Sequence, residues 1–428
     1  MSKTFSSLAI RNYRSYAIGA LSSNVGLWMA RTAQTWLVLV ELTDNDARAL
    51  GLLATCQFLP MLLLSPISGV LADRFPKHRV MLVTQTLLLI NAVLLGFLVT
   101  GEVVQLWHVY LLATLDGSWS AMNAPSRQAF VSELVDKEHL SNAIGLNSAS
   151  FNAARLIGPG LGGLLIAAFG TGPVFFIDAA SYLLIIIALL TLRLDELQPR
   201  PTAARGRGQF RAGLAYIRQR TDLALLMFVA FMMGTFALNF QLTNALMATD
   251  VFGRGAADYG FLGSTMAVGS LTAALAVAGR GKPRLRVLIF AMLGYALCAI
   301  GTTFAPNIWV FAAFLVPQGF CAITVTVSCN TLVQMSTSAA MRGRVMSVFL
   351  AIQMGGTPIG GPVIGLVGEY LGAQWTVALG GITVAFTLLV FTTVLMRRSH
   401  TRLMLERHGW RPSVRLVRVT EDVSNETS

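Results

Sequence analysis

The sequence predicts an all-α polytopic membrane protein with twelve transmembrane helices in two pseudo-symmetric halves of six. Composition is the first indication, because 54% of the 428 residues are hydrophobic and only 12% are charged, whereas soluble domains carry about 25% charged residues. The second is that apolar runs of roughly 20 residues, long enough to cross a bilayer, recur along almost the whole chain. The third is the placement of the basic residues.

The basic residues follow a topological pattern. A net charge of +12 also suits a nucleic-acid-binding protein, but with twelve spans and a cytoplasmic N-terminus, all but four of the 32 Lys and Arg residues lie on the cytoplasmic side or at its boundary. The exceptions are Arg48 and Arg254 outside, and Arg31 and Arg155 within spans. This is the positive-inside bias. It predicts a membrane protein with both termini in the cytoplasm and no nucleic-acid partner.

The apolar runs define an N-terminal half at 1–194, a basic cytoplasmic linker at 195–221, a C-terminal half at 222–396 and a cytoplasmic tail at 397–428. The first span is too long for the apolar region of a cleavable signal peptide, so we expect it to remain as an anchor. The four cysteines fall in apolar stretches and are typical of small buried residues, not of disulfides. The expected spans are 16–41, 48–72, 79–100, 106–127, 142–169, 173–194, 222–249, 258–279, 285–305, 308–331, 343–371 and 374–396.

The second part of the linker has an amphipathic pattern. Phe210, Leu214 and Ile217 share one helical face, and arginines occupy another. This predicts a helix lying on the inner leaflet, with a merely solvated linker as the alternative.

An internal repeat supports two related halves. Ile157-Gly-Pro-Gly-Leu-Gly-Gly163 and Ile359-Gly-Gly-Pro-Val-Ile-Gly365 stand 202 positions apart, about half the chain. One glycine- and proline-rich helix at the same place in each half is what duplicated transporter folds predict.

The most informative motif is the run from Gly69 to Arg79, which lies between two long apolar segments. Its crowded ionisable residues require water or pairing, so we expect residues 73–79 to form a short charged loop on one membrane face. The pattern G-x-L-A-D-R-x-x-K-x-R resembles the loop between helices 2 and 3 of the major facilitator superfamily of transporters.

The run Gly158-Pro-Gly-Leu-Gly-Gly163 resembles the fifth-helix signature of exporters in that superfamily. Gly158, Gly162 and Gly163 permit close helix approach and Pro159 permits a bend. Gly361 and Pro362 are the second-half counterpart. The alternative is a generic packing face of small residues.

Three further blocks, 26–36, 125–135 and 342–347, resemble the superfamily branch that holds the enterobactin exporter and drug–proton antiporters. The resemblance covers most of residues 8–396. It implies rocker-switch alternating access driven by the proton gradient, with no other cofactor. Two departures matter: Ala113 stands where many proton antiporters have Arg, and Thr35 stands where relatives often have an acid.

Ionisable residues inside spans are functional candidates, because lipid makes them costly. Arg31, Asp116 and Arg155 lie near mid-depth of spans one, four and five. If they share a cavity, Asp116 can pair with either arginine and act as the proton carrier; a structural ion pair is the alternative. Asp178 is either a second proton site or a residue exposed to outer water.

The second half has no charge deep in a span but offers amides and aromatic residues suited to an amphipathic ligand. Ordinary packing is the alternative for each. The candidates for a substrate cavity are Trp28, Arg31, Gln34, Trp36, Arg155, Phe236, Asn239, Phe240 and Gln318. A charge excess of two arginines over one aspartate favours acidic ligands.

A gate is expected at the cytoplasmic face. The family counterpart of Asp73 contacts the start of span eleven, where a helix N-terminus favours an anion and where Arg342 and Arg344 add two cations. We expect a latch between the halves here. The gating candidates are Gly69, Asp73, Arg74, Lys77, Arg79, Arg127, Arg342 and Arg344.

The function expected from these features is proton-coupled export of an amphipathic small molecule, drug or siderophore-like, by a carrier that works as a monomer. No catalytic constellation, Walker A motif or metal-ligand spacing occurs, so we expect neither an enzyme nor a metal site. The alternatives are a lipid or lysolipid transporter, an uptake carrier of the same fold, and a membrane receptor that does not transport.

Overall fold

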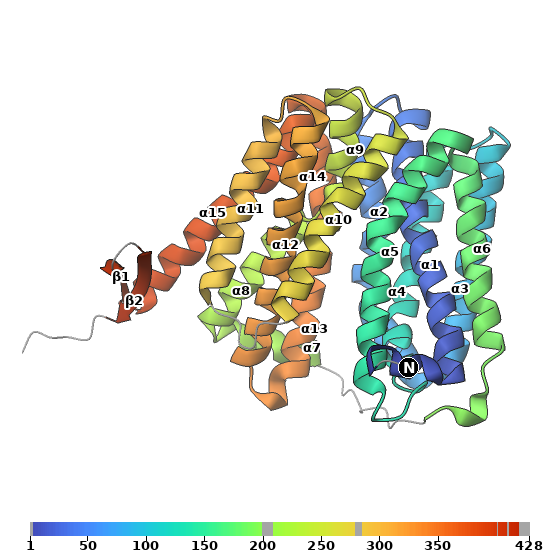
Figure 1. The fold of residues 1–428 in the computed structure, drawn as a ribbon, viewed down its shortest axis with the longest axis horizontal. Helices are drawn as coiled ribbons and strands as arrows, with labels where there is room; N and C mark the ends of the chain where they lie inside the picture. The colour runs from blue at the N-terminus through green and yellow to red at the C-terminus, as the bar shows by residue number, and fades with distance from the viewer. Residues whose placement is uncertain (1–2, 199–208, 279–284, 400, 409–410, 419–428) are drawn as a thin grey trace, which may run out of the picture.

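The computed structural model describes residues 3–198, 209–278, 285–399, 401–408 and 411–418. Two helical bundles stand side by side, the first drawn blue to green and the second yellow to red (Figure 1). The first bundle follows a short 3₁₀ segment, η1 (Lys3–Ala9). Its elements are α1 (Arg11–Trp36) with its π-helical extension η2 (Leu37–Leu42), α2 (Ala47–Arg74), α3 (Lys77–Thr100), α4 (Leu106–Phe130), α5 (Leu140–Phe169), α6 (Thr171–Leu190) and the short η3 (Leu194–Glu196).

The second bundle follows the amphipathic helix α7. Its elements are α7 (Gln209–Arg218), α8 (Thr221–Met232), η4 (Met233–Ala237), α9 (Phe240–Leu246), η5 (Met247–Val251), α10 (Ala256–Ala278), α11 (Leu285–Thr303), α12 (Ile308–Ser336), α13 (Ala339–Gly355), α14 (Thr357–Leu371) and α15 (Ala373–Ser399). The strands β1 (Thr401–His408) and β2 (Arg411–Arg418) then pair antiparallel. This hairpin is not among the elements predicted for the tail.

Ten stretches of the described residues are long and apolar enough to cross a membrane. Helices α1 and α4 are not among them because they carry polar and charged residues, such as Arg31 and Asp116. They are nevertheless 26 and 25 residues long, enough to span a bilayer, and they pack inside the first bundle against α5 and α6 and against α2 and α3. The all-α membrane fold is confirmed, and its helices are consistent with twelve spans.

The charged loop predicted at residues 73–79 is wrong in extent. Helix α2 continues to Arg74 and α3 begins at Lys77, so only Phe75 and Pro76 lie between them. Phe75 is extended, with φ −115° and ψ 152°, as the residue before a proline prefers. One proline-directed corner therefore suffices to reverse the chain.

Two predicted spans are interrupted. The seventh breaks at Leu238–Asn239, where the Asn239 Nδ2 donates to the Thr235 carbonyl at 2.7 Å. That carbonyl is the one an α-helix would pair with the Asn239 N–H, so the side chain competes with the backbone. The eleventh span breaks at Gly356, between α13 and α14.

Glycines set the distances between helices within the first bundle. A Cβ atom on Gly117 of α4 would collide with the Gln57 carbonyl oxygen of α2. A Cβ atom on Gly26 of α1 would lie 2.6 Å from the Asp178 Oδ1 of α6. The first contact is glycine against backbone, and in the second the glycine makes room for polar side chains of α6.

The repeated glycine helices join the two bundles through exchanged contacts. Gly163 of α5 faces the carbonyl of Ala256, the first residue of α10, and a Cβ atom there would collide with it. Gly365 of α14 faces the carbonyl of Ala47, the first residue of α2, 2.7 Å from a Cβ atom. Equivalent glycines thus meet equivalent helix starts of the opposite half, which an approximate two-fold relation between the halves predicts.

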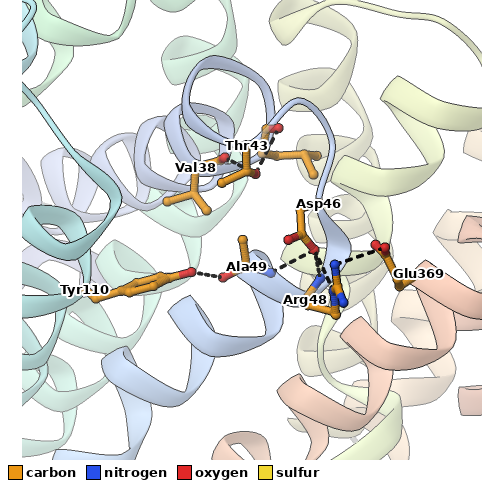
Figure 2. Close-up of polar contacts among 8 residues, drawn as sticks. Val38, Thr43, Asp46, Arg48, Ala49, Tyr110 and Glu369 are labelled. Carbon is orange, nitrogen blue, oxygen red and sulfur yellow. Dashed lines mark hydrogen bonds and ion pairs between the residues drawn. The ribbon is translucent and has the colours of Figure 1, made fainter.

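Figure 2 shows the end of the molecule where α2 begins, called here the far end. Asp46 caps α2 by accepting from the Arg48 N–H at 2.8 Å, and the Arg48 Nη2 lies 3.2 Å from the Glu369 Oε1 of α14. The Tyr110 hydroxyl donates to the Ala49 carbonyl at 3.1 Å. The Arg48–Glu369 ion pair therefore connects α2 of the first half to α14 of the second half.

Contacts between the halves continue from the far end to mid-depth. The Thr55 hydroxyl donates to the Pro358 carbonyl at 2.9 Å, and the Ser264 hydroxyl to the Leu156 carbonyl at 2.7 Å. At the opposite end, called the basic end, lie the α2–α3 turn and the start of α13. There α7 packs on α13, with Gly213 against the Arg344 backbone. The helix predicted in the linker is confirmed, and its position on the inner leaflet stays a prediction.

We predict that Gly117→Ala lowers the apparent melting temperature of the purified protein. The added methyl has no room against the Gln57 carbonyl, and overpacking of this kind costs about 1–3 kcal/mol. Gly145→Ala is the control, because nothing lies within 4 Å of a Cβ atom there and alanine favours a helix. Equal melting temperatures for the two variants would contradict the close α2–α4 contact.

Candidate functional site

A cavity of about 370 Å³ lies between the bundles at mid-depth. Its walls come from α1, α2 and α5 of the first half, and from the segment 238–244, α10 and the α13–α14 break of the second. Five predicted cavity residues line it: Trp28, Arg31, Arg155, Asn239 and Phe240. Both halves therefore contribute to one chamber, as an alternating-access carrier requires.

Four predicted cavity residues do not line the chamber. Gln34 accepts from the lining residue Gln57 at 2.7 Å. Trp36 stacks on the lining residue Tyr259, with ring centroids 6.4 Å apart. Gln318 is buried in α12 and Phe236 is partly buried in η4. The expectation that Trp28 and Trp36 share the pocket therefore holds only for Trp28.

Several lining residues were not among the predicted candidates. They include Gln57, Phe58, Phe151, Gln241, Tyr259 and Met354. Nothing in the sequence separates these residues from the many other aromatic, amide and methionine side chains of the spans. Their selection depends on which face each helix turns towards the interface.

Trp28 forms the centre of the first-half wall. The Arg31 Cζ lies 5.5 Å from its ring centroid and the Arg155 Cζ lies 5.7 Å from it, within the range of cation–π attraction. Phe151 contacts the same ring edge-on at 6.1 Å. Gly158 makes this possible, because a Cβ atom there would be 2.5 Å from the Trp28 Cβ. Helix α5 approaches α1 at this glycine and brings Arg155, one turn earlier, over the ring.

The other residues of the two glycine- and proline-rich runs also lie at helix contacts. Pro159 lines the chamber, and Gly162 packs on the Met29 backbone, 3.2 Å from a Cβ atom. In the second half, Gly361 lies against the Gly51 carbonyl and Pro362 directly follows it. The small-residue runs therefore act first as close-packing surfaces between helices.

The buried charges form a cluster around Arg31. Arg31 interacts electrostatically with Asp116 of α4 and with Asp178 and Tyr182 of α6. No nitrogen–oxygen distance between these groups is within 4 Å among the described ion pairs. Of the two arginines considered for Asp116, Arg31 is the one that faces it. Asp116 itself lies behind the lining, not in it.

The exposure of Asp178 to outer water, one of its two expected roles, is wrong. The residue is only 4% exposed. Its carboxylate lies against Gly26 of α1 and accepts a long hydrogen bond from Ser181 at 3.4 Å. Counting residues along α6 indicates depth but not direction, and residue 178 faces α1.

The gating candidates lie at the basic end, and those with described partners bond within their own half. Lys77 Nζ contacts Glu133 Oε1 at 2.6 Å. Arg127 donates to the Asn24 Oδ1 at 2.7 Å. Arg342 donates to the Gln334 carbonyl at 3.1 Å, and Arg344 to the Met341 sulfur at 3.4 Å. Arg74 and Arg79 are exposed, and Gly69 is half-buried. The Asp73 side chain lies outside the described part, so the latch remains a prediction.

The charged residues of the chamber lining are all positive. In the described part of the chain, its lining includes two arginines and no Asp or Glu, alongside aromatic rings and amides. Among the described residues, no three His, Cys, Asp or Glu side chains gather as a metal site would require. The lining therefore combines positive charge with aromatic and amide surface.

The comparisons with known proteins agree with this description. Residues 2–423 match the family model described as transmembrane secretion effector. The staphyloferrin A transporter of Staphylococcus aureus is 23% identical over 390 residues, which cover 90% of this chain and 96% of that protein. The enterobactin exporter of Shigella boydii is 26% identical over 372 residues, covering 85% and 84% of the two chains.

Solved structures of similar fold are also transporters. The nucleoside transporter NupG superposes with a TM-score of 0.72 at 13% identity, covering 90% of this chain and 99% of that one. A bacterial homolog of the lysosomal transporter Spinster, inward-facing and unoccupied, gives a TM-score of 0.65 at 15% identity over 90% and 95% of the chains. With a family match along nearly the whole chain and this fold, the protein belongs to the major facilitator superfamily, as a member of its transmembrane secretion effector family.

Proposed function

We propose that this protein is a secondary active transporter that exports an amphipathic small molecule, drug or siderophore-like, in exchange for protons. The observation that carries the proposal is the chamber between the halves, closed at the far end, with Arg31 of its lining beside the partly buried Asp116 and the buried Asp178. The two siderophore transporters among the relatives support a ligand of that kind. The proton gradient supplies the energy, and no other cofactor takes part.

The proposed orientation puts the basic end in the cytoplasm, in a bacterial inner membrane with both termini inside. The positive-inside bias supports it. With the halves joined from the far end to mid-depth, the described conformation is then inward-facing. Transport requires the far-end contacts to open while the basic end closes, the rocker-switch motion. One chain supplies both walls of the chamber, which supports function as a monomer.

Proton coupling is assigned to the acids around Arg31. Protonation of Asp116 or Asp178 changes the charge beside Arg31 and so alters the chamber wall. Exchange requires that proton loading and ligand loading oppose each other, so that the carrier reorients with one or the other. A charge moving down the membrane potential supplies about 2.3 kcal/mol per 100 mV, besides the pH term.

The transport assay uses proteoliposomes with an acidic interior and three external probes: staphyloferrin A, enterobactin and ethidium. We expect at least one to accumulate inside, because outward proton flow drives inward movement of an antiported ligand, and to leave when a protonophore collapses the gradient. Accumulation only with the reverse gradient would make the protein an uptake carrier. Binding without gradient-driven flux of any probe would favour a receptor.

We predict that Asp116→Asn abolishes accumulation driven by the pH gradient while leaving exchange of labelled for unlabelled probe intact. An amide cannot carry the proton, but the chamber remains able to bind and alternate. Asp195→Asn, an exposed acid at the basic end, is the control and should behave as the wild type. If Asp116→Asn keeps gradient-driven accumulation, it is not the carrier, and Asp178→Asn is the next variant to measure.

We predict that Glu369→Gln shifts the protein towards the state open at the far end. The Arg48 and Glu369 side chains are 50% and 32% exposed, so the ion pair is worth about 0.2–1 kcal/mol, a shift of up to about fivefold in population. Distances between spin labels at Val103→Cys and Phe304→Cys, exposed sites on the two halves, report the shift. The labels are introduced after removal of the native cysteines.

The matched control for that measurement is Glu196→Gln. Its ion pair with Arg193, at 2.8 Å, lies within the first half, so its loss should leave the label distances unchanged. Identical distance distributions in wild type and Glu369→Gln would show that the far-end ion pair does not bias the conformational equilibrium.

A further inference from the structure

We propose that Arg155 is the charge selector of the chamber: it holds an oxyanion group of the transported molecule, such as a carboxylate, beside the Trp28 ring. The carrier would then accept amphipathic anions and discriminate against neutral and cationic molecules of the same shape. This inference rests on the proposed function and adds the ligand class and the residue that sets it.

Charge balance distinguishes Arg155 from Arg31. Arg31 faces two carboxylates, Asp116 and Asp178. Arg155 has no acidic side chain near it among the described residues. A cation in the middle of a membrane protein is costly unless it is paired or hydrated. The pairing partner of Arg155 is therefore expected to be the ligand itself.

The geometry leaves the Arg155 donors available. Its guanidinium lies over the Trp28 ring at 5.7 Å and makes no hydrogen bond to any described residue. A guanidinium stacked on an aromatic face keeps its N–H groups free at the edge, where a carboxylate binds in a two-pronged manner. The Trp28 Nε1 is also buried without an acceptor. The wall therefore offers several donors that have no acceptor among the described residues.

The rest of the lining suits the remainder of an amphipathic anion. Phe58, Phe151, Phe240 and Met266 provide apolar and aromatic surface, and the Gln241 Nε2 on the facing wall is a further donor without a partner. The volume, about 370 Å³, lies in the range of pockets for drug-sized ligands. An oxygen-rich anion with an apolar or planar body satisfies both the donors and the rings.

The test measures binding to the purified full-length protein in detergent, at constant pH and without any gradient. Three probes share one ring system and differ in charge: 2-naphthoate, 2-naphthamide and 2-naphthylmethylammonium. We expect the wild type to bind naphthoate at least tenfold more tightly than the other two. Arg155→Gln should weaken naphthoate binding at least tenfold and change naphthamide binding little, which removes the preference.

Two further variants separate charge from geometry and from folding. Arg155→Lys keeps the charge but not the two-pronged geometry, so an intermediate preference is expected. Arg254→Gln removes an exposed arginine outside the chamber and should bind all three probes as the wild type does. Arg155→Gln is used only if it elutes as a single species in size-exclusion chromatography. If it does not, the probe preferences of the wild type and of Arg155→Lys test the proposal.

Equal binding of the three probes by the wild type overturns the proposal. So does an unchanged naphthoate preference in Arg155→Gln, which would transfer the anion site to Arg31. Neither result bears on proton-driven flux, and absence of flux leaves the binding preference measurable. The failure of this inference and the failure of the proposed function are therefore distinguishable.

Discussion

The close contact of glycine-rich helices across the two halves is the constraint on which the rest of this structure depends. Gly163 of α5 and Gly365 of α14 each meet the first carbonyl of a helix in the opposite half. Backbone atoms this close leave no room for side chains, so the far end is sealed by main chain packed on main chain. The same approach, at Gly158, sets Arg155 against Trp28 and so forms the wall of the chamber.

Lipid surroundings determine how the charges are arranged. A carboxylate or guanidinium in a span is tolerated when it faces the protein interior and has a partner, and Arg31 with Asp116 and Asp178 meets that condition. The polar content of α1 and α4, which are not among the clearly apolar helices, thus includes Arg31 and Asp116 of this cluster. Arg155 departs from the pattern, and the proposed anionic ligand would supply the missing partner.

The contacts that close the far end are of two kinds. The far-end ion pair of Arg48 and Glu369 is partly exposed and weak, and the glycine contacts beneath it do not interlock side chains. Among the described residues, separating this interface breaks few side-chain hydrogen bonds, such as those that Thr55 and Ser264 donate across it. Two conformations of similar free energy are what a rocker-switch carrier needs.

The sequence by itself determined the membrane class, the helical spans, the repeat and the family resemblance, because each depends on composition or on spacing along one helix. It also identified Trp28, Arg31, Arg155, Asn239 and Phe240 as cavity candidates. Only the tertiary structure decided that Asp178 is buried, that Asp116 faces Arg31 and that Gln34, Trp36, Phe236 and Gln318 stand outside the lining. The physical reason is that depth in a membrane follows from counting residues, whereas the direction a side chain faces follows from helix rotation and packing against other helices.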